Sequence, residues 1–243
     1  MRPVDLAEFP EDWSSALVVV AHPDDVEYGC ASAVARWTGQ GRRVAYLLAT
    51  RGEAGIDGMP PAECAEVRAR EQVASAAEVG VTVVEFLDHP DGMVEYGLPL
   101  RRDVARAVRR HRPEAVIVVN HRENYAPGVL NQADHRVVGQ AAIDAVADAG
   151  NRWVFRELVD EGLAPWSGVR HIAVDASPRA THAVDITDTL AAGVRSLRQH
   201  RAYLEGLGPS WPEPEVFLRA AAENVAGRFG GRLGVAFELL RTS

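Results

Sequence analysis

The sequence predicts an α/β fold: a Rossmann-like three-layer α/β/α sandwich with a mostly parallel sheet and a C-terminal elaboration. Short, continuous apolar runs alternate along the chain with longer helical stretches, which is typical of a parallel sheet covered by helices on both faces. The length of 243 residues fits one sizeable domain. Hydrophobic residues make up 47% of the chain and charged residues 25%, which favours a globular protein and excludes a disordered one.

The expected strands are runs of residues that are apolar throughout. Such runs, unlike alternating ones, indicate strands that are buried on both faces of a sheet. They comprise residues 15–21, 44–50, 81–87, 115–120 and 172–176, with a last strand at 233–240. We expect the connections between parallel neighbours to be right-handed crossovers.

Helical stretches fill the segments between these strands. Residues 61–79 are rich in Ala, Glu and Arg and end at Gly80, and residues 98–111 end before Pro113. The other expected helices span residues 27–39, 134–149, 187–207 and 215–228. We expect a single domain over residues 1–243, with its core at about 15–205 and the C-terminal elaboration at about 206–243.

The composition argues against several kinds of partner. The net charge is −8, from 26 basic and 34 acidic residues, so nucleic acid is not an expected partner. No apolar run approaches the ~18–20 residues of a bilayer helix, and residues 1–13 lack the basic start and apolar core of a secretion signal. Two cysteines, Cys30 and Cys64, cannot form a disulfide framework. We therefore expect a cytoplasmic protein that does not bind a membrane.

His22, Asp24 and Asp25 directly follow the first expected strand. Ligands of open α/β sheets bind beyond the carboxyl ends of the strands, and His and Asp are suitable ligands for zinc or a similar divalent ion. Pro23 stiffens the turn, so His22 and Asp25 can be aimed at one point while Asp24 serves as a base. The alternative interpretation is that the aspartates cap the N-terminus of a helix.

A second polar pair, Asp134 and His135, follows the strand expected at residues 115–120. His135 would add a third ligand to His22 and Asp25. Three protein ligands leave one position open for water, which is the arrangement of a catalytic zinc site. Such an ion acidifies its water and polarises a carbonyl group. Taken alone, Asp134 and His135 would be interpreted as a helix cap and an exposed side chain.

Two motifs give the chain a resemblance to a known family. Residues 21–27 read AHPDDVE and residues 133–139 read ADHRVVG; they resemble the AHPDDxE and HPDHxxxG elements of the LmbE-like, or PIG-L, family of zinc-dependent N-deacetylases. The resemblance covers roughly residues 15–205. Supporting similarities are the segment TRGEAG at residues 50–55, the pair Arg68 and Glu71, the pair Asp91 and Gly92, and residues 196–203.

The resemblance implies a function and a set of residue roles. Members of the family remove the acetyl group from an N-acetylated amino sugar, often N-acetylglucosamine within a larger glycoconjugate. One Zn²⁺ per chain would be held by His22, Asp25 and His135, although iron(II) or cobalt would suit the same ligands. Asp24 would be the general base that activates water, and Asp134 would belong to the same catalytic group.

Gln132 departs from the family pattern, because the second motif often begins with a histidine that helps to stabilise the oxyanion. Gln donates a neutral hydrogen bond, but it cannot be a cation or an acid near pH 7. Three outcomes are open: Gln132 donates to the oxyanion, His121 or His200 takes the role, or the chain acts on another amide or only weakly. The alternatives are an amidase acting on a thiol-sugar conjugate or a glycosylated secondary metabolite, and a binding domain of the same fold.

Arg68, Asp91, His121 and His200 are the candidate substrate-binding residues. Arg68 is otherwise a solvent-facing helix residue, and Asp91 is otherwise a turn residue. A nucleotide-binding Rossmann domain is disfavoured, because the first expected strand is followed by HPDDVEYG instead of a G-x-G-x-x-G turn. Relatives of this kind tend to assemble, so a homo-oligomer is a further expectation.

Overall fold

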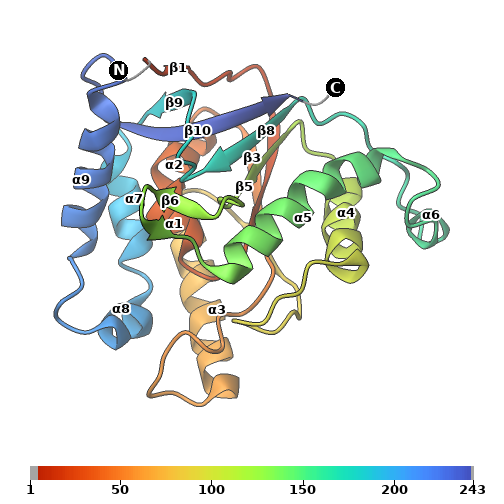
Figure 1. Ribbon diagram of the computed structural model, residues 1–243, viewed down its shortest axis with the longest axis horizontal. Helices are drawn as coiled ribbons and strands as arrows, with labels where there is room; N and C mark the ends of the chain where they lie inside the picture. Colours follow the sequence, from red (N-terminus) through yellow and green to blue (C-terminus); the bar gives the residue numbers. More distant parts are fainter. Residues whose placement is uncertain (1–4, 242–243) are drawn as a thin grey trace.

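An eight-stranded sheet lies at the centre of the computed structural model, which describes residues 5–241 (Figure 1). Its strand order is β1-β9-β10-β8-β5-β2-β3-β4. The strands are β1 (Ala7–Glu8), β2 (Ser15–Val20), β3 (Arg43–Leu48), β4 (Val83–Phe86), β5 (Ala115–Val118), β8 (His171–Asp175), β9 (His182–Asp185) and β10 (Gly234–Arg241). A separate hairpin pairs β6 (Asn124–Ala126) with β7 (Val129–Leu130). Residues 1–4 and 242–243, the two ends of the expected domain, lie outside the described residues.

Five neighbouring strands, β8, β5, β2, β3 and β4, are all parallel. From β2 the chain adds β3 and β4 on one side, and it then places β5 on the other side of β2. β10 enters the same sheet antiparallel, between β8 and β9. The mostly parallel α/β class expected from the sequence is confirmed. The reversal of strand order between β2 and β5 creates the crevice in which such sheets bind their ligands.

Helices cover both faces of the sheet. α4 (Leu98–His111) and α5 (Ala133–Gly150) pack together on one face, as Figure 1 shows. The opposite face carries α2 (Ala31–Gly39), α3 (Pro61–Glu78), α7 (Leu190–Leu197) and α9 (Pro214–Ala226). The shorter helices of the described chain are α1 (Asp25–Gly29), α6 (Glu157–Asp160) and α8 (Arg201–Leu207).

Two of the expected helices are each divided by a short break. The stretch 27–39 divides into α1 and α2 at Cys30, whose φ is −119°. The stretch 187–207 becomes helical only at Leu190 and is interrupted at residues 198–200, between α7 and α8; the φ and ψ of His200 are −78° and 57°. Apolar periodicity continues across breaks of one to three residues, so the sequence pattern does not reveal them. It also gives no signal for β1 and β9, which are two and four residues long.

The core is built on the apolar runs that predicted the strands. β2 is buried along its whole length, and Leu17 of β2 and Ile117 of β5 are fully buried. The ring of Trp37, on α2, lies 6.0 Å from that of Phe237 on β10, so the C-terminal strand shares the same core. This packing gives the loops after β2 and β5 a rigid base.

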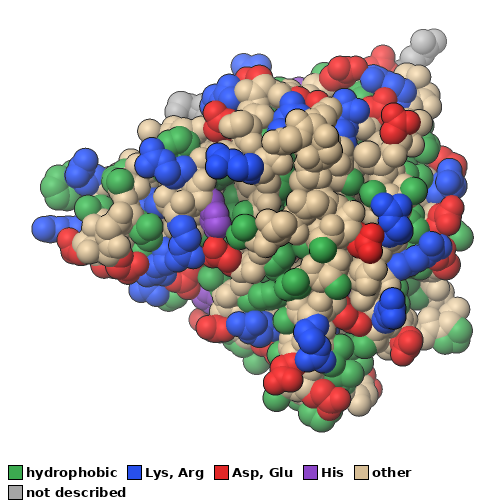
Figure 2. Space-filling view, turned by 180° about the vertical axis from the view of Figure 1, so that it is seen from behind, with side chains coloured by type: hydrophobic (Ala, Val, Ile, Leu, Met, Phe, Trp, Pro, Cys, Tyr) green, Lys and Arg blue, Asp and Glu red, His purple; other side chains and the backbone are tan. Residues whose placement is uncertain are grey.

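Basic and acidic side chains are interspersed over the face shown in Figure 2. Many surface charges are paired, as in Arg106 with Glu161 and Arg110 with Glu85. Such exposed pairs stabilise a fold only slightly. Within residues 5–241, no helix combines the length and the apolar character that crossing a bilayer requires.

Candidate active site

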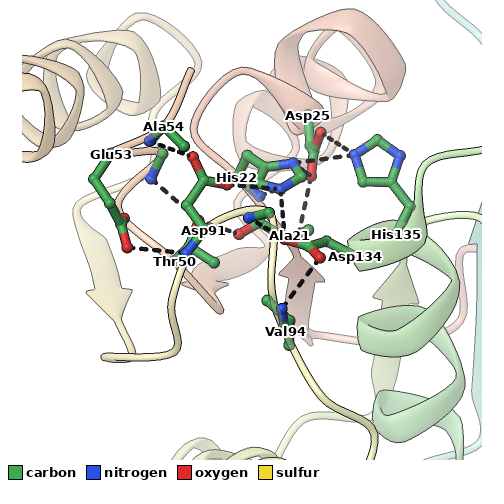
Figure 3. Close-up of polar contacts among 12 residues, drawn as sticks. Ala21, His22, Asp25, Thr50, Glu53, Ala54, Asp91, Val94, Asp134 and His135 are labelled. Carbon is green, nitrogen blue, oxygen red and sulfur yellow. Dashed lines mark hydrogen bonds and ion pairs between the residues drawn. The ribbon is translucent and has the colours of Figure 1, made fainter. Parts of the chain in front are cut away.

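The two polar loops meet at the carboxyl edge of the sheet. One follows β2, and the other leads into α5, which follows β5 in the chain. Because β2 and β5 are parallel neighbours, their carboxyl ends bring both loops to the crevice where the strand order reverses. Figure 3 shows the side chains of His22, Asp25 and His135 pointing toward one another.

His22, Asp25 and His135 present three donor atoms to one point. His22 Nδ1 lies 3.2 Å from His135 Nε2, and His135 Nε2 lies 3.0 Å from Asp25 Oδ1. The other oxygen of Asp25, Oδ2, accepts the backbone N–H groups of Ala21 and His22 at 3.0 and 2.9 Å. These bonds fix the carboxylate, so its Oδ1 is directed at the imidazole of His135.

The second ring nitrogen of His22 faces two further carboxylates. His22 Nε2 lies 3.1 Å from Asp91 Oδ1 and 3.3 Å from Asp134 Oδ2. A proton on Nε2 therefore has acceptors, and the lone pair of Nδ1 is left to face Asp25 and His135. Carboxylates behind a histidine commonly set the tautomer of a metal ligand in this way.

Asp91 and Asp134 are themselves held by backbone N–H groups. Asp134 accepts from Gly92 at 2.7 Å and from Val94 at 3.2 Å. Asp91 accepts from Ala54 at 2.8 Å. Both carboxylates are therefore fixed behind the ring of His22, which orients that ring.

His135 is oriented by Asn131 and Tyr125. Its Nδ1 lies 3.2 Å from Asn131 Oδ1 and also contacts the Tyr125 hydroxyl, which the β6–β7 hairpin supplies. The amide nitrogen of Asn131 donates to the carbonyls of Asn120 and Arg122, so its oxygen must face the imidazole. The Nδ1–H of His135 then donates to Asn131, and its Nε2 lone pair points to the common centre.

The donor set fits a divalent cation. Two ligands at ~2.0–2.1 Å from a tetrahedral zinc ion lie about 3.4 Å apart, close to the 3.2 and 3.0 Å that separate His135 Nε2 from its two neighbours. His22, Asp91 and Asp134 form a second group with suitable spacing. We favour the first group, because it brings two imidazole nitrogens and a carboxylate oxygen to one point, whereas the second group contains one imidazole and two carboxylates.

Negative charge dominates the electrostatics of this centre. Burial alone would lower the pKa of His22, but the carboxylates of Asp25, Asp134 and Asp91 raise it well above its usual value. Burial alone would raise the pKa of Asp25, but His135 and His22 hold it well below its usual value. The centre therefore favours a positive charge, which a metal ion would supply.

Asp24 lies beside these residues in an unusual backbone conformation. Its φ of 88° is left-handed, which is uncommon for a residue with a side chain and recurs at functional positions. Its N–H donates to Gln72 Oε1 at 3.0 Å, and its Oδ1 accepts from Arg68 Nη2 at 2.7 Å. Burial raises the pKa of Asp24 to about 6, although the charge of Arg68 opposes this shift. A carboxylate with this pKa can accept a proton near neutral pH.

Arg68 is buried and does not face solvent as an ordinary helix arginine would. Besides Asp24, it donates to the carbonyls of Pro23 at 2.6 Å and Gly52 at 3.1 Å. A Cβ atom at Gly52 or Gly55 would lie 2.3 or 2.1 Å from Arg68 Nη1. The two glycines of the TRGEAG segment therefore leave room for this guanidinium group.

A cavity of about 350 Å³ opens onto the centre. The side chains of α8 close one side of it, because Tyr203 and Leu207 belong to its wall. Tyr203 covers Arg68, whose guanidinium carbon lies 4.3 Å from the centre of the ring. The predicted site residues in its wall are His22, Asp24, Asp25, Arg68, Asp91, Gln132 and Asp134.

His121 and His200 do not belong to this wall, so the structure does not bring them together with the other candidate residues; their contact with a substrate stays a prediction. His121 lies against Gly139 of α5, where its Cβ is 3.0 Å from the position of an added Cβ. His200 is fully buried, with Nε2 3.4 Å from Glu27 Oε2. Glu27 in turn accepts from Gln72 at 3.0 Å, so His200 belongs to a buried network behind Asp24.

The sequence reasoning missed several residues that shape the centre. Gln72 lies four residues after Arg68 on α3, which is the spacing of neighbours on one helix face. Asn131 also lies four residues before His135, but it precedes α5, so helical spacing does not apply to this pair. Gln72 therefore had a usable signal. Tyr125 and Tyr203 come from the hairpin and from α8, and neither spacing nor composition indicates their approach.

A doubly wound sheet with two histidines and an aspartate at its switch point is typical of a metal-dependent hydrolase. The sequence profile of the family described as GlcNAc-PI de-N-acetylase (PIG-L) matches residues 17–146. This match covers more than half of the 243 residues. The chain therefore belongs to the PIG-L family, as the motifs predicted, and it is an N-deacetylase.

Individual relatives carry the same indication. The chain is 29% identical to diacetylchitobiose deacetylase of Thermococcus kodakarensis, over 87% of this chain and 77% of the relative. It is 38% identical to 1D-myo-inositol 2-acetamido-2-deoxy-alpha-D-glucopyranoside deacetylase of Kineococcus radiotolerans, over 62% of this chain and 48% of the relative. The structure of N,N'-diacetylchitobiose deacetylase from Pyrococcus horikoshii, complexed with its inhibitor MPG, superposes with a TM-score of 0.86 and 27% identity, covering 95% of this chain and 85% of that one.

Proposed function

We propose that the protein is a zinc-dependent hydrolase that removes the N-acetyl group from an N-acetylated amino sugar, free or within a glycoconjugate. The observation that carries this proposal is the convergence of His22, Asp25 and His135 beside the buried carboxylate of Asp24. The names of the two relatives, which both refer to deacetylation of acetamido sugars, support the substrate class.

One Zn²⁺ per chain would be held by His22 Nδ1, Asp25 Oδ1 and His135 Nε2. The two imidazoles and the carboxylate are the donor types that zinc prefers. When bound, the ion would polarise the amide carbonyl and make water more acidic. Asp91 and Asp134 would act indirectly, since they hold the ring of His22 in its ligating orientation.

Asp24 would act as the general base and then as the acid. Its carboxylate takes a proton from the water that attacks the acetamide carbon, and it returns that proton to the nitrogen as the C–N bond breaks. The products are acetate and the free amine. Arg68 holds one oxygen of Asp24 at 2.7 Å, so the carboxylate keeps one orientation through both transfers.

Gln132 would stabilise the carbonyl oxygen as it gains negative charge. It is the residue before α5 and lies in the cavity wall, and its side chain makes no capping bond to that helix. The side chain of Gln132 is therefore not held at the N-terminus of α5 by a capping bond, and its amide N–H₂ group can serve as a donor toward the cavity. A neutral donor at this place would leave most of the charge to the metal ion.

Arg68 and Asp91 would also contact the sugar hydroxyls, because both lie in the cavity wall. The volume of about 350 Å³ is at the small end of ligand pockets. It therefore suits one sugar ring with its acetamido group.

A second candidate function is hydrolysis of a different amide, such as that of a thiol-sugar conjugate or a glycosylated secondary metabolite. Gln132, in place of the family histidine, favours this reading. Both candidates use the same residues for the chemistry and differ only in the substrate.

The test is a metal analysis of the purified protein, followed by an assay of acetate release from a panel of N-acetyl amino sugars and acylated conjugates. We expect one zinc ion per chain and acetate from at least one amino sugar. A chelator should remove both the zinc and the activity, and returning zinc should restore both. A metal-free protein that zinc does not activate would refute the proposal. Activity restricted to the conjugates would favour the second candidate.

A further inference from the structure

An aromatic cluster lies next to the catalytic cavity, and the chemistry described above does not use it. It consists of Tyr28 on α1, Phe217 on α9 and Trp211 on the loop between α8 and α9. The rings of Tyr28 and Phe217 are 5.1 Å apart, and those of Tyr28 and Trp211 are 6.2 Å apart. Trp211 is 45% exposed, which is unusual for so large an apolar ring.

The cluster is joined to the wall of the cavity from two sides. Tyr28 lies one helical turn after Asp24, and its N–H donates to the Asp24 carbonyl at 3.0 Å. Leu207, the last residue of α8, belongs to the cavity wall. The N–H of Trp211 donates to the carbonyl of Gly208 at 3.2 Å, which turns the chain back toward the end of α8. Trp211 therefore lies on the loop that directly follows the α8 side of the cavity wall.

The indole of Trp211 is held with one side covered. Its Nε1–H donates to the Tyr28 hydroxyl at 2.9 Å. Phe217 stacks against it, with ring centres 6.5 Å apart and planes inclined by 19°. Pro212 follows Trp211 directly and restricts the backbone of the loop. A ring that is fixed in this way loses little freedom when a ligand stacks on its open side.

The charged side chains around the loop between α8 and α9 are paired with one another, so we do not expect the loop to bind an ionic ligand. Arg198 bonds to Glu213 at 2.6 Å and to Glu215 at 3.4 Å, and Arg219 lies 3.6 Å from Glu215, so two cations face two carboxylates. A neutral ring with an apolar CH face is the ligand that suits a fixed indole. The unit attached to the amino sugar in a saccharide is such a ring.

We infer that Trp211, supported by Tyr28 and Phe217, forms a second sugar subsite that binds the neighbouring ring of a di- or oligosaccharide substrate. The inference rests on the proposed function, since it assumes that the acetamido sugar occupies the catalytic cavity. The substrates of the enzyme are accordingly saccharides of two or more rings, and single amino sugars bind more weakly.

The test compares N-acetylglucosamine with N,N'-diacetylchitobiose as substrates of the zinc-loaded wild-type enzyme and of Trp211→Ala. Stacking on an aromatic ring contributes about 5- to 10-fold in affinity. We expect Trp211→Ala to raise KM for the disaccharide by this factor, with kcat and the monosaccharide kinetics unchanged. Trp211→Phe retains a ring and should recover part of the loss. Trp153→Ala, which removes another exposed tryptophan, is the matched control. It should leave kcat and KM unchanged for both substrates.

Equal effects of Trp211→Ala on both sugars, or no effect on the disaccharide, would overturn the subsite. Saturation-transfer NMR with the disaccharide gives a second reading that needs no turnover. Saturation of the protons of the second ring in the wild type, lost in Trp211→Ala, supports the subsite, and its absence in the wild type contradicts it. If the zinc-loaded wild type releases acetate from neither of these sugars nor from any other amino sugar of the panel, the proposed function fails, and the NMR result alone decides about the subsite.

Discussion

Asp24 lies between two proposed metal ligands, His22 and Asp25, in the sequence. Its own contacts differ from theirs. Its backbone is left-handed, and its carboxylate pairs with Arg68 instead of with either imidazole. Gln72 accepts the Asp24 N–H and thereby helps to hold this conformation. A residue that is held so firmly without being a ligand can be changed separately from the metal site.

We predict that Asp24→Asn lowers kcat by about 10²- to 10⁴-fold, because the proton acceptor is lost. Its metal content should stay at the wild-type level, because the three ligands are intact. The two quantities are measured on the same preparations by steady-state kinetics and elemental analysis. Survival of turnover in the variant would show that another group is the base.

Gln132 allows a separate test at the same scale. We predict that Gln132→Ala lowers kcat by about 10²-fold, the usual effect of removing one donor from an oxyanion site. The zinc content and the KM should change little, since Gln132 is neither a ligand nor deeply buried. An unchanged kcat would show that another residue donates the stabilising hydrogen bond.

The sequence allows the proposed ligands to be placed but not their orientation. His22, Asp25 and His135 were predictable because they follow parallel strands whose carboxyl ends must meet. The tautomer of His135 depends on Asn131, whose amide is fixed by two backbone carbonyls, and no sequence spacing indicates those bonds. His200 lies in the expected region of the chain, but its complete burial beside Glu27 depends on the break between α7 and α8.

At the scale of elements, the approach of α5 to β5 sets the position of His135. Gly139 lies one helical turn after His135, and a Cβ atom there would be 2.3 Å from the carbonyl oxygen of Val119. The helix therefore packs directly against the backbone that follows β5. The glycine of the second motif is explained by this close contact.

We predict that Gly139→Ala destabilises the fold by about 1–3 kcal/mol, the range for overpacking, and weakens zinc binding because α5 must shift with His135. Gly39→Ala is the matched control, because a Cβ at Gly39 of α2 would meet no atom within 4 Å. Its stability should be equal to or slightly above that of the wild type. Urea unfolding and zinc titration provide the measurements. Equal stability of the two variants would contradict the close packing.

The class of fold and the long elements follow from the sequence, whereas the short elements do not. The apolar runs at residues 15–21, 44–50, 115–120 and 172–176 correspond to buried parallel strands, as expected for strands covered on both faces. The run at 81–87 forms the partly exposed edge strand β4, and the run at 233–240 forms the antiparallel strand β10. The β6–β7 hairpin that carries Tyr125 is too short and too polar to give such a pattern. Residues of this kind reach the site through tertiary contacts alone.

At the scale of the whole molecule, one buried carboxyl group couples stability to pH. Asp175 is the last residue of the parallel strand β8 and packs against Gly29, where a Cβ would lie 1.7 Å from its Oδ2. Burial raises the pKa of Asp175 from 3.8 to about 7, with Asp25 adding to the rise and the N–H of Ala176 opposing it. The folded state therefore binds this proton more tightly than the unfolded state does. The resulting stabilisation is present below about pH 4 and is lost as the pH rises through about 7.

We predict that Asp175→Asn removes this dependence. Between pH 5 and pH 8, the free energy of unfolding of the wild type should fall relative to that of the variant by about 2–3 kcal/mol. Urea unfolding of both proteins at the two pH values measures the difference. A difference that does not change with pH would show that Asp175 is not protonated in the fold near neutral pH.

The C-terminal strand also acts on the whole molecule, because β10 lies between β8 and β9 and joins them into one sheet. Phe237 of this strand packs in the core with Trp37.

The single domain, the homo-oligomer and the cytoplasmic location expected from the sequence stay predictions.

The most direct measurement is the zinc content per chain of the wild type and of His135→Ala, each purified, chelated and reloaded under the same conditions. We predict one ion per chain in the wild type and a strongly reduced content in the variant, because two protein ligands do not hold zinc tightly. Normal zinc content in His135→Ala, or none in the wild type, would contradict a metal centre formed by the loops after β2 and β5.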